Sequence, residues 1–347
     1  MKTQVLIVDD SEVYRLFLRN ALAGVTDVEV VSVASNGRLA MPRVNHYKPD
    51  IVLLDYDMPE MDGLAAIPEI KRLSPKTRII MFSTHTTQGA RLTLKALELG
   101  ADDFIAKPAG ALGGTVADDL RAKLLEHIRG FVVTNTTRVA PAEPKPLLKA
   151  RDARAVKKFR YCLIGISTGG PPALRRLFKL LPADLKGSIL VVQHMPPLFT
   201  AQLAESLNEE SALTIVEATT GVRPQPATVY IAPGGKQMRL KPDAHGDAVI
   251  IVEESDPKEL CKPSVNILFN SAAEFCAPET TAIIMTGMGE DGYMGMKALS
   301  AGGAYLMAQQ QEDCVIFGMP AKPIRDGIID EEHDVEGLAK KITEYLR

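Results

Sequence analysis

Short apolar runs that alternate with amphipathic stretches constrain the fold of this 347-residue chain most strongly. Five such runs occur between residues 4 and 129: QVLIV, VEVVSVA, DIVLLD, RIIMFS and DFIA. Continuous apolar runs are typical of parallel strands that are buried on both faces, and the amphipathic helices between them supply the cover. We therefore predict a small doubly wound α/β domain over residues 1–130.

A second set of apolar runs follows in the C-terminal half: YCLIGI, SILVVQH, LTIVEA and TAIIMT, again separated by amphipathic segments. Turn residues divide short β-type runs between about 226 and 252, which indicates a hairpin. The pattern predicts a second, larger, doubly wound α/β domain over residues 159–347, with a mostly parallel sheet and a β-hairpin elaboration.

The periodicity fails in residues 131–158. Pro141, Pro144 and Pro146 oppose regular structure there, and basic residues outnumber acidic ones. We interpret this segment as a solvated interdomain linker that becomes partly helical towards its end. A nucleic-acid patch is the alternative, but no interleaved aromatic residues support it.

Charge and composition narrow the function classes further. With 46% hydrophobic and 24% charged residues, the chain has the composition of an ordinary soluble protein. Its net charge of −3 favours neither nucleic acid nor anionic membrane as a partner. Asp9 and Asp10 interrupt the N-terminal apolar run, and no run approaches the roughly 20 apolar residues of a membrane span. We expect a cytoplasmic protein without membrane insertion.

The four cysteines are far apart in the sequence, with no CxxC pair and no neighbouring histidine. They are Cys162, Cys261, Cys276 and Cys314. This spacing predicts buried free thiols rather than a zinc site or a disulfide framework.

Acidic residues follow the predicted strands of the first half. Asp9 and Asp10 end the first strand, Asp55 ends the third, Ser83 ends the fourth and Lys107 follows the fifth. Ligands of open parallel sheets bind beyond the carboxyl ends of the strands, so these side chains are expected at one edge. Carboxylates that converge in this way are typical of a Mg²⁺ site that also accepts phosphate oxygens.

The motifs VDDS, LLDYDMPEMDGL, MFSTH and AKP make this half closely similar to the receiver domain of bacterial response regulators, which has a flavodoxin-like fold. The resemblance implies that Asp55 is the phosphoacceptor and that Ser83 and Lys107 contact the phosphoryl group. It also implies Mg²⁺ for phosphorylation, held at the residues Asp9 (through water), Asp10, Asp55 and Asp57 (through its backbone carbonyl).

GISTG, residues 165–169, places Ser167 in a glycine-rich turn between a predicted strand and a helix. Such a turn serves either a bound phosphate or a nucleophile, because backbone N–H groups point at an anion in both. A dinucleotide site needs an acid at the end of the next strand, where Gln193 and His194 stand, and a P-loop needs a lysine that STGGPP lacks. The nucleophile interpretation is therefore favoured.

A nucleophilic serine needs a base and a carboxylate that orients it. His194 ends the strand after Ser167, and Asp291 lies in the glycine-rich loop after the run TAIIMT. The order Ser, Asp, His would instead make His245 or His333 the base, but both stand in strongly polar surroundings that favour solvated histidines. We predict the triad Ser167, His194 and Asp291, with the backbone N–H groups near Thr168 and Met288 as oxyanion donors.

The motifs IGISTGG, VVQHMP, YIAPGG, KPSVNILFNSAA, MTGMGEDGYMGM and FGMP resemble the catalytic domain of protein-glutamate methylesterases, the CheB family of bacterial chemotaxis. The chain departs from the usual family text in YDMP, STHTT and the glutamate of GEDG, and all proposed catalytic groups are retained. The resemblance implies a serine hydrolase that removes glutamate γ-methyl esters from chemoreceptors, with a possible glutamine deamidase activity and no cofactor for ester hydrolysis.

The family resemblance also implies regulation and partners: activation by phosphorylation, methyl-accepting chemoreceptors as substrates and a chemotaxis histidine kinase as phosphodonor. A non-catalytic response regulator whose second domain is an adaptor is the alternative from another class. A DNA-binding output is less favoured because no terminal helix-turn-helix pattern follows. An esterase that acts in a chemosensory pathway unrelated to swimming also remains open.

Overall fold

The computed structural model describes residues 2–84, 86–108, 114–136 and 158–347. The chain divides into two compact units, residues 1–136 and 137–347, and each is described by itself. Most of the predicted linker lies outside the described residues. Its first part, from residue 131, continues a helix that ends at Thr136, so regular structure extends beyond the expected boundary at residue 130.

The N-terminal unit is a five-stranded parallel sheet with the order β2-β1-β3-β4-β5. Its strands are β1 (Thr3–Val8), β2 (Val28–Ala34), β3 (Ile51–Asp55), β4 (Arg78–Thr84) and β5 (Asp103–Lys107). These are the five apolar runs that the sequence predicts. Both β1 and β3 are buried along most of their length, as strands covered on two faces must be.

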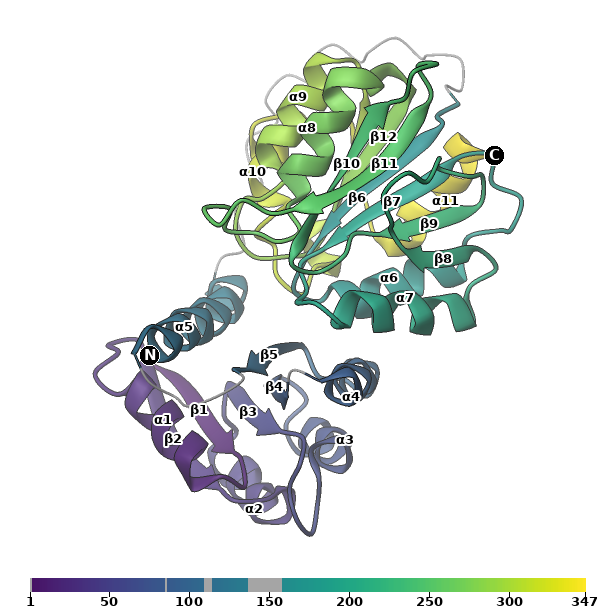
Figure 1. The fold of residues 1–347 in the computed structure, drawn as a ribbon. Helices are drawn as coiled ribbons and strands as arrows, with labels where there is room; N and C mark the ends of the chain where they lie inside the picture. Colours follow the sequence, from purple (N-terminus) through teal and green to yellow (C-terminus); the bar gives the residue numbers. More distant parts are fainter. Residues whose placement is uncertain (1, 85, 109–113, 137–157) are drawn as a thin grey trace. The chain divides into compact units, whose positions relative to one another are not determined.

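Helices cover both faces of this sheet (Figure 1). They are α1 (Glu12–Leu22), α2 (Gly37–Tyr47), α3 (Gly63–Leu73), α4 (Thr87–Glu98) and α5 (Gly114–Thr136). Helices α1 and α5 contact each other, and α2 contacts α3, which contacts α4. Side-chain oxygens of Ser11, Asn36, Asp62 and Thr86 cap the first four helices and satisfy N–H groups of their first turns.

The C-terminal unit contains a seven-stranded parallel sheet with the order β14-β13-β12-β6-β7-β9-β8. Its strands are β6 (Tyr161–Ile166), β7 (Ser188–Gln193), β8 (Thr214–Glu217), β9 (Thr228–Ile231), β12 (Thr280–Ile284), β13 (Tyr305–Gln309) and β14 (Glu331–His333). The central strands β12, β6 and β7 are completely buried. The doubly wound, parallel-sheet fold class predicted for both halves is confirmed.

Helices again cover both faces, as Figure 1 shows for α8 and α9 on one side and α6 and α7 on the other. The α-helices are α6 (Gly170–Lys179), α7 (Phe199–Glu210), α8 (Val265–Phe275), α9 (Tyr293–Ala301), α10 (Ala321–Arg325) and α11 (Val335–Leu346). Two short 3₁₀ turns, η1 (Ala277–Glu279) and η2 (Gln311–Asp313), complete the unit.

The predicted hairpin exists but is shorter than expected. Strands β10 (Lys236–Pro242) and β11 (Ala248–Glu254) pair antiparallel as a separate two-stranded sheet. Strand β9, which the sequence suggested as part of the same elaboration, instead joins the large sheet between β7 and β8. The hairpin packs on α8 and closes one side of the core.

One apolar core joins the sheet, α8 and the hairpin. Leu163 of β6, Leu240 of β10 and Phe269 of α8 all belong to it and are at most 1% exposed. None of the helices within the described ranges is long and apolar enough to cross a membrane.

Substitution of Phe269, which is 0% exposed, tests this core. Phe269→Ala should lower the free energy of unfolding by about 3–5 kcal/mol because it removes a large buried side chain and leaves a cavity. Urea denaturation of the full chain measures this, and Leu260→Ala is the matched control because Leu260 is 98% exposed. Equal small effects in both variants would contradict the assignment of Phe269 to the core.

Candidate active site

Ser167 and His194 follow two paired strands of the large sheet. Ile166 of β6 and Gln193 of β7 are register partners, so the residues that come directly after them leave the sheet at the same edge. The His194 backbone N–H donates to the Ile166 carbonyl at 3.1 Å, which extends the pairing by one residue. Strand β12 lies on the other side of β6 and leads to Asp291. The structure therefore brings Ser167 and His194 to the ends of two adjacent strands, and Asp291 to the loop that follows the third.

Asp291 is bound at the N-terminus of α8. Its carboxylate accepts hydrogen bonds from the Val265 N–H at 2.7 Å, the Asn266 N–H at 3.0 Å and the Ser264 hydroxyl at 3.0 Å. Free N–H groups and the helix dipole favour a negative charge at this position. Burial alone would raise the pKa of Asp291, but its hydrogen bonds with His194 and these backbone groups lower it. The carboxylate is thus held in one orientation and ionised.

His194 is hydrogen-bonded to Asp291, with 2.8 Å between His194 Nε2 and Asp291 Oδ2. Burial opposes the charged imidazole, but the bond with Asp291 and the neighbouring Cys261 raise the pKa of His194 to about 9. When Nε2 donates its hydrogen to the carboxylate, the neutral ring carries its lone pair on Nδ1. The arrangement can orient an imidazole and stabilise its cation.

The turn that carries Ser167 is hydrogen-bonded to the loop after β12. The Ser167 N–H donates to the Thr286 carbonyl at 2.9 Å. A Cβ atom at Gly287 would lie only 2.7 Å from Ser167 Cβ, so glycine is needed for this close approach. Thr168 is 4% exposed and directly follows Ser167, and Met288 directly follows Gly287. Thr168 therefore adjoins the serine along the chain, and Met288 is one residue beyond the glycine that packs on it.

Gln193 joins the backbones on both sides of the site. Its Nε2 donates to the Ser167 carbonyl at 3.0 Å and lies 3.4 Å from the His194 carbonyl. The residue is 2% exposed, and a Cβ atom at Gly170 would lie 1.9 Å from its Oε1, so the start of α6 must be glycine to admit the amide. Gln193 is therefore a positioning residue, a role that its place at the end of a strand did not predict.

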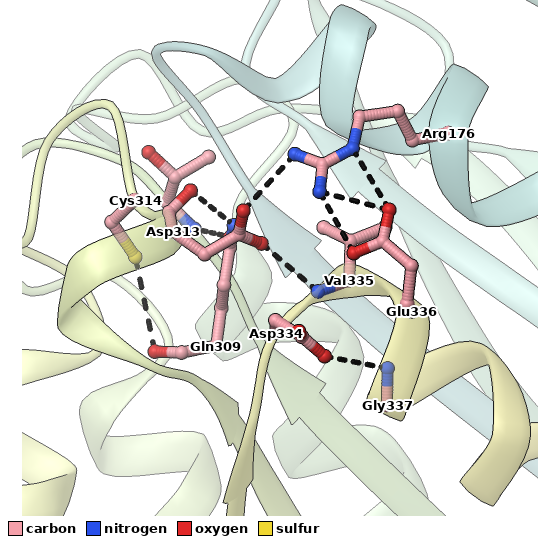
Figure 2. Close-up of polar contacts among 9 residues, drawn as sticks. Arg176, Gln309, Asp313, Cys314, Asp334, Val335, Glu336 and Gly337 are labelled. Carbon is pink, nitrogen blue, oxygen red and sulfur yellow. Dashed lines mark hydrogen bonds and ion pairs between the residues drawn. The ribbon is translucent and has the colours of Figure 1, made fainter.

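A network of polar residues supports the turn that carries Ser167. The Thr286 hydroxyl donates to the Thr168 carbonyl at 2.9 Å, and the Thr286 N–H donates to Gln309 Oε1 at 2.9 Å. Figure 2 shows how the network continues from Gln309 to Asp313 and from there to Arg176 of α6, which also pairs with Glu336 of α11. No local sequence signal distinguishes these residues, because their partners are distant in the chain.

Cys261 is a further neighbour of the catalytic residues that the sequence did not predict. Ligand atoms of Cys261, His194 and Asp291 all lie within 4.8 Å of one another. Cys162 and Cys276 are buried and Cys314 is partly buried, and all four thiols are free. No histidine is close to a cysteine along the chain, and this predicted that no cysteine would lie beside a histidine. The prediction is wrong for Cys261, because the fold brings it close to His194.

The two alternative bases lie elsewhere. His245 is an exposed residue in the turn between β10 and β11, where its N–H donates to Asp243. His333 belongs to β14, three strands away from β6, and its Nε2 lies 2.8 Å from Glu331. Neither histidine shares the edge position next to Ser167 that His194 occupies.

The acidic cluster predicted for the first half also assembles. Ligand oxygens of Asp9, Asp10 and Asp55 lie within 4.8 Å of one another. Lys107 Nζ lies 3.0 Å from Asp9 Oδ2 and 2.8 Å from Asp55 Oδ2. This all-oxygen donor set fits a hard cation such as Mg²⁺. Asp57 is exposed two residues beyond β3, where only its backbone carbonyl was expected to take part.

Burial dominates the electrostatics of this cluster. Burial, followed by repulsion from Asp9, raises the pKa of Asp55 to about 6, against the opposing effect of Lys107. Burial also raises the pKa of Asp9. For Lys107 burial alone would lower the pKa, but the carboxylates of Asp55 and Asp9 outweigh it and raise the pKa. The cluster is a site where added positive charge is favourable.

Ser83 is 3% exposed at the end of β4, close to the start of α4. Its hydroxyl donates to the Gly89 carbonyl at 3.1 Å and accepts from the Thr93 hydroxyl at 2.6 Å. A hydroxyl has one hydrogen to donate. Donation from Ser83 to a phosphoryl oxygen therefore requires its bond to α4 to break.

Thr286→Val tests the support of the Ser167 turn. The change keeps the side-chain shape but leaves the buried Ile316 N–H without its acceptor and the Thr168 carbonyl without its donor. The free energy of unfolding should fall by about 1–3 kcal/mol. Urea denaturation measures this loss. Thr214→Val, at an exposed position of β8, is the control, and its free energy of unfolding should stay within about 0.5 kcal/mol of that of the parent chain. Equal free energies of unfolding in the two variants would contradict the proposed support.

Comparison with known proteins agrees with the geometry in both units. Residues 162–342 match the family model described as CheB methylesterase, and residues 5–112 match the response regulator receiver domain. A protein-glutamate methylesterase/protein-glutamine glutaminase of Desulfotalea psychrophila is 38% identical over 99% of this chain and 98% of its own length. The relative with the same description from Archaeoglobus fulgidus is also 38% identical, over 99% and 98%.

A solved structure extends the likeness to the fold. The Thermotoga maritima CheB methylesterase catalytic domain aligns with a TM-score of 0.52 at 37% identity, over 54% of this chain and 98% of that domain. The similarity thus covers the sheet on which Ser167, His194 and Asp291 lie. The chain belongs to the CheB methylesterase family and joins a response regulator receiver domain to a methylesterase domain.

Proposed function

We propose that this protein hydrolyses glutamate γ-methyl esters on chemoreceptors to glutamate and methanol and is activated by phosphorylation of its receiver domain. One observation carries the proposal: Ser167 and His194 follow two paired strands, and His194 Nε2 is bonded at 2.8 Å to Asp291 Oδ2, which lies in the loop after the third strand. The names of the relatives, protein-glutamate methylesterase/protein-glutamine glutaminase, supply the substrate class.

In this mechanism Ser167 Oγ attacks the ester carbonyl carbon while His194 takes the hydroxyl proton. The proton goes to Nδ1, since Nε2 is engaged with Asp291. Asp291 stabilises the resulting imidazolium, and its bonds to α8 keep it from turning away. Collapse of the tetrahedral intermediate expels methoxide, which receives the proton from His194 and leaves as methanol. Water, activated by the same histidine, then releases glutamate from Ser167.

The negative oxygen of the tetrahedral intermediate needs donors that are already in place. We assign the backbone N–H groups near Thr168 and Met288 to this role, because Thr168 follows Ser167 directly and Met288 follows Gly287, which packs on Ser167. A glutamine side chain would follow the same steps with ammonia as the leaving group. That second activity is the one named in the relatives' glutaminase description.

For the receiver domain we propose that Asp55 accepts a phosphoryl group from a chemotaxis histidine kinase. Mg²⁺ would be held by Asp9, Asp10 and Asp55 and the backbone carbonyl of Asp57, and would neutralise charge on the transferred group. Lys107, already between Asp9 and Asp55, would bind the phosphoryl oxygens. Ser83 would exchange its bond to Gly89 for one to the phosphoryl group, which would alter the start of α4.

We place the protein in the cytoplasm, with methylated receptor segments as substrate and without nucleic-acid or membrane-inserted partners. The adaptor alternative keeps the phosphorylation step but assigns no reaction to the second unit. The hydrogen-bonded His194–Asp291 pair next to Ser167 favours the enzyme, because an adaptor surface does not need a histidine oriented by a carboxylate.

Lys107→Ala tests the receiver site. Removal of the ammonium leaves the Asp9 and Asp55 carboxylates unopposed and deprives the phosphoryl group of a cation, so phosphorylation by acetyl phosphate with Mg²⁺ should slow on the order of tenfold or more. Intact-protein mass spectrometry follows the added phosphoryl group. Lys95→Ala, at an exposed position, is the control and should keep the parent rate of phosphorylation. Asp55→Asn should abolish the modification. Phosphorylation that persists in Asp55→Asn would refute the assignment of Asp55 as the acceptor.

Ser167→Ala tests the esterase. Methanol release from methylated chemoreceptor should fall by a factor of about 10³ or more, as expected when the nucleophile of a serine hydrolase is lost. Ser300→Ala, on α9, is the control and should retain the rate. Each protein is assayed with and without acetyl phosphate and Mg²⁺, and wild-type release should rise with the phosphodonor. A folded wild-type protein that phosphorylates but releases no methanol would favour the adaptor.

A further inference from the structure

We propose that Cys261, His194 and Asp291 form a binding site for a thiophilic divalent cation such as Zn²⁺, and that occupation of this site switches the esterase off. The sulfur, a ring nitrogen and a carboxylate oxygen of the three residues lie within 4.8 Å of one another. These are the donor types that zinc prefers.

The spacing fits one ion after a small side-chain movement. Ligands of a tetrahedral zinc ion lie roughly 3.5 Å apart, given metal–ligand bonds of about 2.0–2.3 Å. His194 Nε2 and Asp291 Oδ2, at 2.8 Å, must move slightly apart, and no pair of the three ligand atoms is more than 4.8 Å apart, so shifts of about 1 Å bring all three to one ion. All three residues are partly exposed, so the ion can enter from solvent and a water molecule can complete the coordination. Cys261 also adjoins Leu260, which is 98% exposed.

The surroundings of Asp291 resemble those of a metal-binding carboxylate. Ligand side chains at metal sites are usually fixed by hydrogen bonds from a second layer of residues. The Val265 and Asn266 N–H groups and the Ser264 hydroxyl hold both oxygens of Asp291 in this way. The carboxylate is positioned from the α8 side, whereas His194 and Cys261 approach it from other segments.

The described residues thus include two candidate cation clusters with different donor atoms. Asp9, Asp10 and Asp55 offer only oxygen, which favours Mg²⁺, whereas Cys261 and His194 add sulfur and nitrogen, which favour zinc or cobalt. Because donor type sorts these ions, Mg²⁺ at the receiver site should leave the second cluster free. The two ions would then act on the protein independently.

Binding at Cys261 involves no redox change. The thiol loses its proton to solvent and a sulfur–metal bond forms. His194 Nε2 gives up its hydrogen bond to Asp291 and donates its lone pair to the ion, while its hydrogen passes through solvent to Nδ1. An imidazole that ligates a metal cannot take the proton of Ser167. Inhibition follows from that competition and rests on the proposed function, but binding of the ion does not.

The experiment uses the reduced, metal-free full-length protein with Mg²⁺ in excess and Co²⁺ as the probe. Binding should produce a thiolate-to-cobalt absorption band in the near ultraviolet that Zn²⁺ abolishes. Cys261→Ser should remove the band, and Cys314→Ser, a partly buried thiol elsewhere in the unit, should keep it. Ser167→Ala should bind Co²⁺ like the wild type, which separates the metal site from ester hydrolysis.

A second measurement needs no substitution. Zn²⁺ should protect Cys261 of the wild-type protein from iodoacetamide by at least tenfold, as read by peptide mass spectrometry.

In the esterase assay Zn²⁺ should inhibit the wild type at concentrations at least tenfold below those that inhibit Cys261→Ser. A cobalt band that survives in Cys261→Ser, the absence of any band in the wild type, or an unprotected Cys261 would each overturn the proposal.

Discussion

The parallel pairing of β6 with β7 and with β12 is the constraint on which the site depends. It places the residues after Ile166, Gln193 and Ile284 at one edge of the sheet, although Ile166 and Ile284 are more than a hundred positions apart along the chain. Loops then need only a few residues to present Ser167 and His194. The rigid, buried strands fix the distances, and the loops supply the chemistry.

The two halves share one architecture but place different side chains at the edge of the sheet. In each, a doubly wound sheet delivers charged side chains to the carboxyl ends of its central strands. In the receiver unit, three carboxylates and Lys107 suit a phosphoryl group and a hard cation. In the other unit, one partly exposed carboxylate is hydrogen-bonded at a helix N-terminus and orients an imidazole. Function here follows from the residues at the edge and not from the fold.

Much of this was predictable from the sequence, because buried parallel strands are continuous apolar runs. The runs found β1 to β8 and β12, and the residues that directly follow them included Ser167 and His194. Strands β13 and β14 were missed: β13 although Tyr305–Gln309 is mostly buried, and β14 because Glu331–His333 has no apolar pattern. Strand β9 was assigned to the hairpin because turn residues flank it. Gln309 and Cys261 were missed because only tertiary structure brings them near the site.

The central claim is that Ser167 and His194 act as one unit, and a double-mutant comparison of methanol release tests it most directly. Residues that share one proton transfer lose their effect together, so the double variant should be about as slow as either single variant. Ser167→Ala, His194→Ala and the combined variant should share the same residual rate. Losses that multiply in the double variant would show that the two residues act in separate steps and would contradict the account.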